Sequence, residues 1–152
     1  MSVDMADDLE AIRQLKARYF RLMDMKDWAG WAQCFTEDVV VRVDSAVSDG
    51  RNLVAPFPIP TGRDAFVAQN SETLRGVVTV HHGHMPEIAL TSATTATGVW
   101  SMEDKLIWRD GSRLHGFGHY HETYRKEADG EWRIATIDLT RLRLDHLPPP
   151  TA

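Results

Sequence analysis

The chain has 152 residues, of which 43% are hydrophobic and 26% are charged, and its formal net charge is -5 at pH 7. This length suits one domain with a sizeable hydrophobic core. An acidic chain without a lysine-rich run lacks the basic surface on which sequence-independent nucleic-acid binding depends. We therefore expect no nucleic-acid partner.

The single cysteine, Cys34, has no second cysteine with which to form an intramolecular disulfide. The opening segment MSVDMADDLE is acidic and polar, unlike a secretory signal. No uninterrupted apolar run approaches the ~18 residues that span a bilayer. These features predict a cytoplasmic protein with no membrane partner.

The first predicted helix has apolar residues at three- and four-residue spacing, and Asp7 or Asp8 is expected to cap it. Tyr19 lies on the apolar stripe, so its hydroxyl must find a partner or face a cavity. Asp24 falls at the helix end, where a carboxylate opposes the helix dipole. Some other interaction of Asp24 should offset this penalty.

Asp27 is expected to cap a short second helix, with Trp28 and Trp31 in the core. A turn is predicted over residues 36–38, followed by a strand in the β-branched run VVVRV, residues 39–43.

Residues 45–62 are too long and too rich in proline for regular structure. Such a loop is often a lid or a subunit contact. Thr61 with Asp64 resembles a capping box that opens a third helix, and Gly76 is expected to end that helix.

Four long strands are predicted after Gly76, over residues 77–90, 96–109, 112–126 and 132–143, the first of them bent at Pro86. Asp-Gly pairs at residues 110–111 and 129–130 indicate hairpins. Helices followed by long antiparallel strands predict an α+β domain, with helices on one face of a curved sheet that encloses a mostly apolar cavity.

The strand over residues 96–109 has a carboxylate on its apolar face. Side chains alternate along a strand, so one face holds Trp100, Met102, Asp104, Leu106 and Trp108. A carboxylate among apolar neighbours is costly unless it is paired. Its candidate partners are His81, His82 and His84 on the preceding strand, and a purely structural hydrogen bond from a tryptophan or a backbone amide is the alternative.

The last strand is predicted to place Arg141 and Arg143 at the end of an apolar row with Ala135, Ile137 and Leu139. An arginine that points inward is a candidate anion anchor. The alternative is that both arginines lie past the core and point to water.

Three blocks of the sequence resemble the SnoaL-like branch of the nuclear transport factor 2-like superfamily: AIRQLKARYFRLMDMKDWAGWAQCFTEDVVV, TVHHGHMPEIAL with TTATGVW, and GHYHETYRKEADGEWRIATIDLTRLR. Their pattern is most similar to scytalone dehydratase and bile acid 7α-dehydratase. The resemblance implies a cone-shaped α+β fold, in which about three N-terminal helices pack on a strongly curved, mostly antiparallel sheet around a pocket. We expect one domain over residues 1–146 and a proline-rich tail over residues 147–152.

The resemblance also implies a catalytic set. Tyr19, Asp24 and His81 match the helix tyrosine, the aspartate five residues later and the histidine of the first long strand, and Asp104 matches a second acid or base. Arg141 or Arg143 falls where the bile acid enzyme has an arginine. Strand alternation alone would place His82, not His81, on the more apolar face. We follow the resemblance, take His81 as the pocket histidine and keep His82 as the second candidate. Substrate-binding candidates are His82, Trp100, Met102, Arg141 and His119, the last of which has no family counterpart.

The predicted function is that of a lyase, dehydratase or isomerase that acts without a cofactor on a hydroxylated polyketide, alicyclic or steroid-like compound. Elimination next to a carbonyl needs a base, an electrophile for the enolate and an acid for the leaving hydroxyl. We expect His81, held by Asp104, to act as base or acid. Tyr19 would donate to the carbonyl oxygen, and Asp24 would orient Tyr19 or a water.

The main alternative is a module of the same fold that binds a ligand or a partner without turnover. A metal site is a third possibility, because His82-x-His84-x-x-Glu87 resembles cupin spacing, but the matching second motif is missing. No metal is therefore expected. A homodimer or homotrimer is expected, since Trp132, Leu142 and Leu144 are predicted to be exposed.

Overall fold

The computed structural model describes residues 3–44 and 58–150, with side chains from Met5 onward. Its elements are α1 (Val3–Asp24), α2 (Trp28–Ala32), β1 (Phe35–Val43), α3 (Arg63–Thr73), β2 (Val78–Leu90), β3 (Thr95–Ile107), β4 (Arg113–Lys126) and β5 (Trp132–Leu147). Most of the loop predicted over residues 45–62, and hence its role as a lid or subunit contact, lies outside the described residues.

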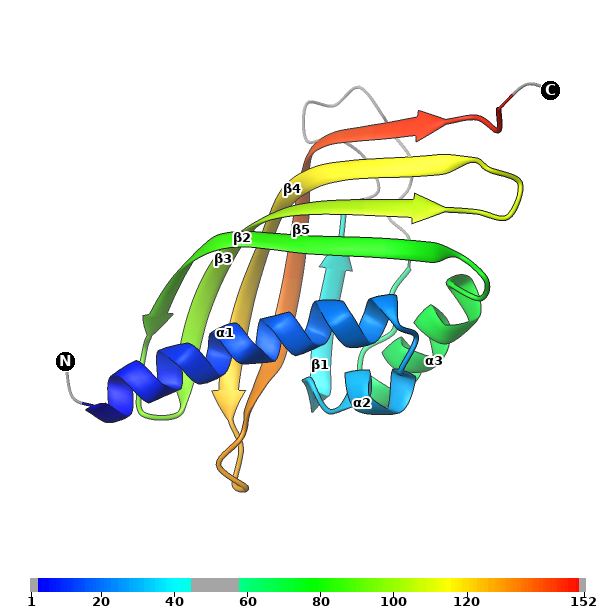
Figure 1. Ribbon diagram of the computed structural model, residues 1–152. Coiled ribbons are helices and arrows are strands. Elements are labelled where there is room, and N and C mark those ends of the chain that lie inside the picture. The colour runs from blue at the N-terminus through cyan, green and yellow to red at the C-terminus, as the bar shows by residue number, and fades with distance from the viewer. Residues whose placement is uncertain (1–2, 45–57, 151–152) are drawn as a thin grey trace.

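The five strands form one curved sheet in the order β1-β5-β4-β3-β2 (Figure 1). β1 pairs parallel with β5, whereas the other neighbouring strands pair antiparallel. α1 lies along β2 on one face of the sheet. α2 and α3 lie on the same face, next to the C-terminal end of α1, and α3 contacts β1. The predicted α+β cone, with helices on one face of a mostly antiparallel sheet, is confirmed.

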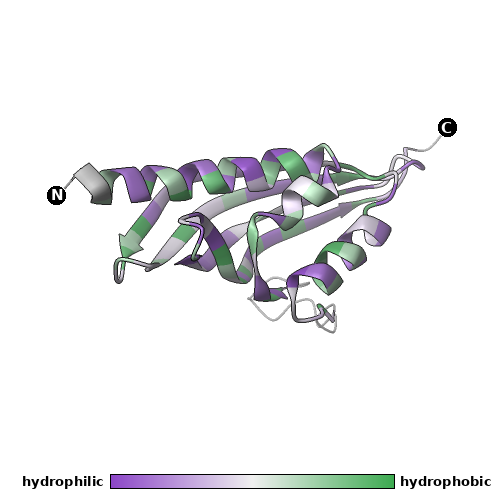
Figure 2. Cartoon of the chain, turned by 90° about the horizontal axis from the view of Figure 1, so that it is seen from below, coloured by the Kyte–Doolittle hydropathy of each residue, from purple (hydrophilic) through white to green (hydrophobic). Residues whose placement is uncertain are grey.

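The core lies between α1 and the sheet. Ile12, Leu15, Tyr19 and Met23 form the buried stripe of α1, at the spacing that places side chains on one helix face. Apolar and polar residues alternate along the strands and around α1, as Figure 2 shows. The prediction for Trp31 is confirmed, because it is fully buried, whereas Trp28 is only partly buried against the same cluster.

The turns and the bend agree with the sequence. Gly111 and Gly130 have φ angles of +85° and +84°, which glycine adopts readily, and they join β3 to β4 and β4 to β5. The pairing of β2 with β3 shifts between His84 and Glu87, close to the predicted bend at Pro86. Such a shift in register increases local twist and helps the sheet to curve.

Two helix caps were predicted wrongly. α1 begins at Val3, before Asp7 and Asp8. The Asp8 carboxylate instead accepts hydrogen bonds from Trp132 Nε1 at 2.8 Å and Lys126 Nζ at 2.9 Å, tying α1 to the far hairpin. At α3 the N-cap is Gly62, with no side-chain cap, so the Thr61–Asp64 capping box is absent.

The other predicted local features have mixed outcomes. Asp27 does cap α2, since its side chain accepts a hydrogen bond from the Gly30 amide at 2.9 Å. The predicted turn over residues 36–38 is part of β1, which begins at Phe35. α3 ends at Thr73, and Gly76, with a φ angle of +70°, follows in the turn.

β5 contains two register shifts that break its predicted alternation. Its pairing with β4 shifts opposite Thr123/Tyr124 and again opposite Phe117/Gly118. Ala135 therefore leaves the buried row, and Arg143 is exposed and bonds to Asp145. Only Arg141 of the two arginines is buried. The strand also continues to Leu147, past its predicted end at residue 143.

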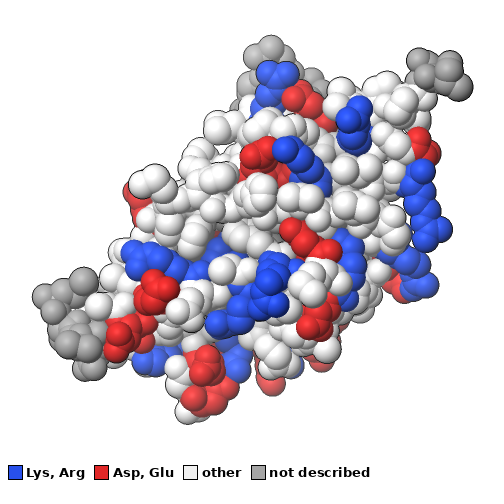
Figure 3. All heavy atoms as spheres, viewed as in Figure 1, with Lys and Arg blue, Asp and Glu red and all other residues white. Residues whose placement is uncertain are grey.

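The surface supports the predicted assembly only in part. Trp132 is buried against the core, so it is not available for a subunit contact, and Leu144 is half-buried. Leu142 is 62% exposed. Basic and acidic side chains are interspersed over the face shown in Figure 3. The homodimer or homotrimer stays a prediction. Among the described residues, no helix has the length and apolar character needed to cross a bilayer.

Candidate active site

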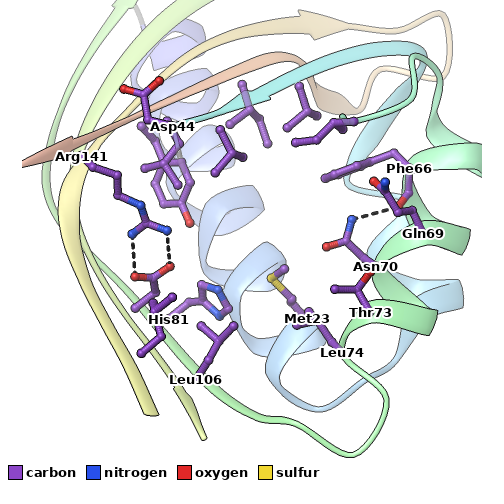
Figure 4. A pocket seen from close by; sticks show the side chains of 18 of the residues that line it. Met23, Asp44, Phe66, Gln69, Asn70, Thr73, Leu74, His81, Leu106 and Arg141 are labelled. Atoms are coloured by element: carbon purple, nitrogen blue, oxygen red, sulfur yellow. Dashed lines mark hydrogen bonds and ion pairs between the residues drawn. The ribbon is translucent and has the colours of Figure 1, made fainter. Parts of the chain in front are cut away.

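A cavity of about 440 Å³ lies between the inner face of the sheet, α1 and α3. Its walls are mostly apolar, with side chains such as Met23, Phe66, Leu74 and Leu106 (Figure 4). Its polar lining from α1 and the sheet consists of Tyr19, Asp44, His81, Asp104, Tyr120, Arg141 and His146. A few polar groups in an apolar cavity are typical of small-molecule sites.

His81 is held by Asp24. The His81 Nδ1 atom lies 2.7 Å from Asp24 Oδ1, and the His81 backbone amide donates to Asp24 Oδ2 at 2.9 Å. The carboxylate therefore binds both the ring and the main chain of the same residue. An ionised carboxylate only accepts hydrogen bonds, so this contact requires the proton on Nδ1. In the neutral ring the Nε2 lone pair is then free to accept a proton.

A hydrogen-bond chain continues behind this dyad. Thr79 Oγ1 donates to Asp24 Oδ1 at 2.9 Å, and Lys26 Nζ donates to Thr79 Oγ1 at 2.6 Å. An ammonium group can only donate, so the single hydroxyl proton of Thr79 must point to Asp24. Lys26 has a φ angle of +61° in the turn after α1. The donor directions of the chain are thus fixed, and they converge on Asp24, from Lys26 through Thr79 on one side and from His81 on the other.

These contacts answer the question of why an aspartate ends α1. Burial acts to raise the pKa of the Asp24 carboxyl, but hydrogen bonds from His81 and Thr79 outweigh it and lower that pKa below its ordinary value. Asp24 is therefore ionised at neutral pH. The predicted offsetting interaction exists, and its partner is His81.

We expect Thr79→Val to raise the Asp24 pKa, since the variant removes one hydrogen bond to the carboxylate. A lowered carboxyl pKa stabilises the fold above the ordinary carboxyl value, and this stabilisation is lost as the pH falls through the lowered value. In the variant this stabilisation should be smaller, and its loss should be complete at a higher pH. A ¹³C NMR titration of the Asp24 carboxyl measures the shift. Thr123→Val, on the exposed side of β4, is the control, and an unchanged Asp24 titration in Thr79→Val would contradict the chain.

Asp104 and Arg141 form a second buried pair beside His81. Arg141 Nη1 and Nη2 donate to the two Asp104 oxygens at 2.6 and 2.8 Å. Burial acts to lower the Arg141 pKa, but Asp104 outweighs this effect and the pKa is raised. A bidentate pair of this kind is strong and fixes both side chains. Asp104 stands directly opposite His81 in the β2–β3 pairing.

Gly116 makes room for this ion pair. On β4 it stands opposite Asp104, and a Cβ atom at this position would clash with the guanidinium of Arg141 and the carboxylate of Asp104. β4 runs between the strands that bear Asp104 and Arg141, so the two side chains meet above the backbone of Gly116. Any side chain at this position would occupy the space in which they meet.

We therefore expect Gly116→Ala to destabilise the fold by about 1–3 kcal/mol, the usual effect of overpacking a buried site. Urea unfolding gives the change in free energy. Wild-type stability, together with a crystal structure that keeps the Asp104–Arg141 contact, would show that the backbone adjusts and that the glycine is dispensable.

Two tyrosines complete the polar end of the cavity. Tyr19 and Tyr120 are almost fully buried, and their ring centroids are 6.2 Å apart. Burial raises the pKa of both hydroxyls above the ordinary value. Both hydroxyls therefore stay protonated at neutral pH. Tyr19 shares its proton with Tyr120, and a ligand oxygen that displaces this contact can accept a hydrogen bond from the hydroxyls.

A buried ion pair between Lys16 and Glu122 packs against these tyrosines. Lys16 Nζ lies 3.9 and 3.8 Å from the ring centroids of Tyr19 and Tyr120. Glu122 binds Lys16 and also accepts a hydrogen bond from Tyr124 at 2.5 Å. Burial lowers the Lys16 pKa, and Glu122 opposes this effect. The network fixes the two cavity tyrosines from the side of the core.

The family model for the SnoaL-like domain matches residues 4–138. The chain belongs to the SnoaL-like family. This finding confirms the resemblance inferred from the sequence blocks.

Solved structures share the fold of this SnoaL-like protein. A protein from Novosphingobium aromaticivorans, provisionally described as a scytalone dehydratase, is 20% identical and has a TM-score of 0.80, with 100% of this chain and 95% of that chain covered. A hexachlorocyclohexane dehydrochlorinase (LinA) Type2 is 14% identical, with a TM-score of 0.78 and coverage of 95% and 92%. A Mycobacterium tuberculosis protein of unknown function is 27% identical, with a TM-score of 0.71 and coverage of 90% and 73%.

The SnoaL-like structure brings most predicted catalytic residues together. Tyr19, His81, Asp104 and Arg141 line the same cavity, and Asp24 lies directly behind His81. Between the two candidate histidines, His81 is the one that lines this cavity. The predicted pairing of His81 with Asp104 is wrong: among the described residues, the His81 ring bonds to Asp24 and the Asp104 carboxylate bonds to Arg141.

Other predicted binding residues lie elsewhere. His82 is exposed and His119 half-buried, and neither lines the cavity. Alternation places them on the face of the sheet opposite His81. Trp100 and Met102 are buried in the core and do not line the cavity either, and Trp100 Nε1 donates to the Tyr124 hydroxyl at 2.8 Å. Within residues 3–44 and 58–150, no cluster of three or more His, Cys, Asp or Glu side chains is placed to hold a metal ion.

The sequence interpretation missed Tyr120, Lys16 and Glu122, and the polar residues of α3. Tyr120 and Glu122 had a readable signal, because they continue the alternating row of β4 that starts at Gly116. Lys16 also lies on the buried stripe of α1, four residues after Ile12. Lysine is so rarely buried that spacing alone did not single it out.

Proposed function

We propose that this SnoaL-like protein is a cofactor-independent lyase, most simply a dehydratase, that acts on a small hydroxylated ring compound by general acid–base catalysis. The observation that carries the proposal is the Asp24–His81 dyad at the wall of an apolar cavity. The described activities of two fold neighbours, a dehydratase and a dehydrochlorinase, are both eliminations. A base that removes a proton from carbon is the step such reactions share.

In this mechanism the His81 Nε2 atom takes a proton from the carbon next to a ligand carbonyl. The electrons of the broken C–H bond form an enolate, whose oxygen accepts a hydrogen bond from Tyr19. The enolate then expels the β-hydroxyl group as the C=C bond forms. That hydroxyl takes a proton from the His81 imidazolium and leaves as water. The ring thus returns to its starting state, and one C–H and one C–O bond have been broken.

The other polar residues would position these groups. Asp24 keeps the His81 proton on Nδ1 and stabilises the imidazolium after proton transfer, as carboxylates do in other catalytic dyads. The Asp104–Arg141 pair would fix the wall beside His81 and keep the Arg141 guanidinium near the developing enolate. The apolar walls suit alicyclic, polyketide-derived or steroid-like rings.

Elimination and hydrogen–deuterium exchange on simple cyclic ketones test the proposal. The protein would be incubated in D₂O with 3-hydroxycyclohexanone and with a bicyclic β-hydroxy ketone. Ultraviolet absorbance reports the conjugated enone, and mass spectrometry reports deuterium at the carbon next to the carbonyl. We expect both signals to exceed the buffer rate for the bicyclic compound.

Ketone binding without enone formation or deuterium uptake would instead support the non-catalytic binding module. Deuterium uptake with no loss of water would show that the same base forms the enolate without elimination, the step that an isomerase uses. Thermal stabilisation of the protein by the ketone measures binding independently of reaction.

A further inference from the structure

α3 places a second polar group across the cavity from His81. Gln69, Asn70 and Thr73 line the cavity from this helix. Figure 4 shows them on the side opposite Arg141 and His81, with the apolar Met23 and Leu74 side chains between the two sides. The catalytic mechanism uses none of the three residues.

The Asn70 amide is fixed in one orientation. Its Nδ2 atom donates to the Phe66 carbonyl oxygen at 2.9 Å. A carbonyl oxygen can only accept, so the NH₂ group and not the oxygen must face Phe66. Asn70 Oδ1 consequently remains on the cavity side as an acceptor, with no further hydrogen bond within the described residues.

The Gln69 amide is oriented in the same way. Its Nε2 atom donates to the Pro58 carbonyl oxygen at 2.8 Å, so its amide oxygen is also left as an acceptor. The amide NH₂ groups of this side are thus bound to the backbone. A ligand group that meets the two amide oxygens has to supply a hydrogen-bond donor.

The charges of the cavity favour a neutral donor. Two carboxylates line it, and both lie on the Arg141 side: Asp44 is seen there in Figure 4, and Asp104 bonds to Arg141. An ammonium group beside Asn70 would be removed from water without a carboxylate partner, which is costly. A hydroxyl group donates one hydrogen bond without this penalty.

We propose that Asn70 Oδ1 is a specificity-determining acceptor for a neutral hydroxyl that the ligand carries at the end remote from His81. The ligand class is therefore a small ring compound with a polar group at each end. The inference rests on the proposed function in one respect: it assumes that the ligand bound at Asn70 is also the compound that reacts at His81.

The test compares three probes by isothermal titration calorimetry: naphthalene, 2-naphthol and 2,6-dihydroxynaphthalene. The second hydroxyl of the diol can reach a polar partner only if the cavity has one at each end. A net hydrogen bond in a protein site is worth about fivefold in affinity. We expect the diol to bind wild-type protein about fivefold more tightly than 2-naphthol, and this gain to vanish in Asn70→Leu.

Ser71→Ala is the matched control on the same helix, since Ser71 is outside the cavity and bonds only to the Ala68 carbonyl. It should keep the fivefold gain. Asn70→Ala provides a second variant should leucine disturb the packing of α3. An equal gain in wild type and in both Asn70 variants, or no gain in any of the proteins, would overturn the proposal.

The same titrations in His81→Ala separate this inference from the proposed function. The dependence on Asn70 should persist there, since binding at the far end does not require the base. Ketone turnover that persists in His81→Ala, with an unchanged Asn70 effect, would overturn the proposed function alone. Normal turnover with no Asn70 effect would overturn this inference alone.

Discussion

His81→Ala is expected to lower turnover of a ring ketone about 10²- to 10⁴-fold, the usual contribution of a positioned general base. The ring lies at the cavity wall and is held by Asp24. Initial rates of enone formation measure the loss. His82→Ala is the control, because the neighbouring ring is exposed and does not line the cavity. Turnover of His81→Ala near the wild-type rate would assign the base to another residue.

Asp24→Asn should lower turnover with little change in the fold, since an amide can donate to Nδ1 and favours the wrong tautomer. The double variant with His81→Ala should be little worse than the worse single variant, because residues that act as a unit are non-additive. Asp138→Asn, whose carboxylate pairs with Arg42 on the surface, is the matched control. Independent, additive losses would contradict the dyad.

Lys16→Met is expected to cost about 3–5 kcal/mol of stability, because it leaves the Glu122 carboxylate buried without its counter-charge. Both side chains are fully buried. Urea unfolding at neutral pH measures the change. Lys105→Met, which removes a partly exposed partner of Glu103, should stay within about 1 kcal/mol of wild type.

Adding Glu122→Leu to Lys16→Met should restore much of the lost stability, since replacing a whole buried ion pair by apolar groups is often nearly neutral. Recovered stability in the double variant would show that the loss in Lys16→Met comes from the unpaired Glu122 charge and not from the packing of the new methionine. A Lys16→Met protein as stable as wild type would show that Glu122 finds another partner or a proton, and that the ion pair does not hold the cavity tyrosines.

Local sequence patterns predicted the parts of this fold that depend on residues close to one another in the sequence. Period-two runs gave the long strands, and the Asp-Gly pairs at Gly111 and Gly130 gave two of the three hairpins between β2 and β5. The bulges of β5 were not predictable, because an extra residue in a strand leaves no compositional mark. For that reason alternation placed Arg143 on the same row as Arg141 and could not choose between them, whereas in the structure Arg143 lies outside.

The candidate site shows a similar division. Strand alternation and the family resemblance identified Asp104, Arg141 and His81 as candidates, but pairing depends on contacts between distant segments. Asp24 is 57 residues from His81, and Arg141 is 37 residues from Asp104. Spacing within one element cannot choose between such partners. The choice follows from the curvature that brings the end of α1 against β2.

The proposed chemistry depends on His81 presenting an unprotonated Nε2 atom to the cavity. The ¹⁵N chemical shifts of the His81 ring, measured in labelled protein at mildly alkaline pH, report this directly. We expect a protonated Nδ1 and a bare Nε2 in wild type, and a mixed or reversed tautomer in Asp24→Asn. A wild-type ring protonated on Nε2, with a bare Nδ1, would contradict the assignment of His81 as the base.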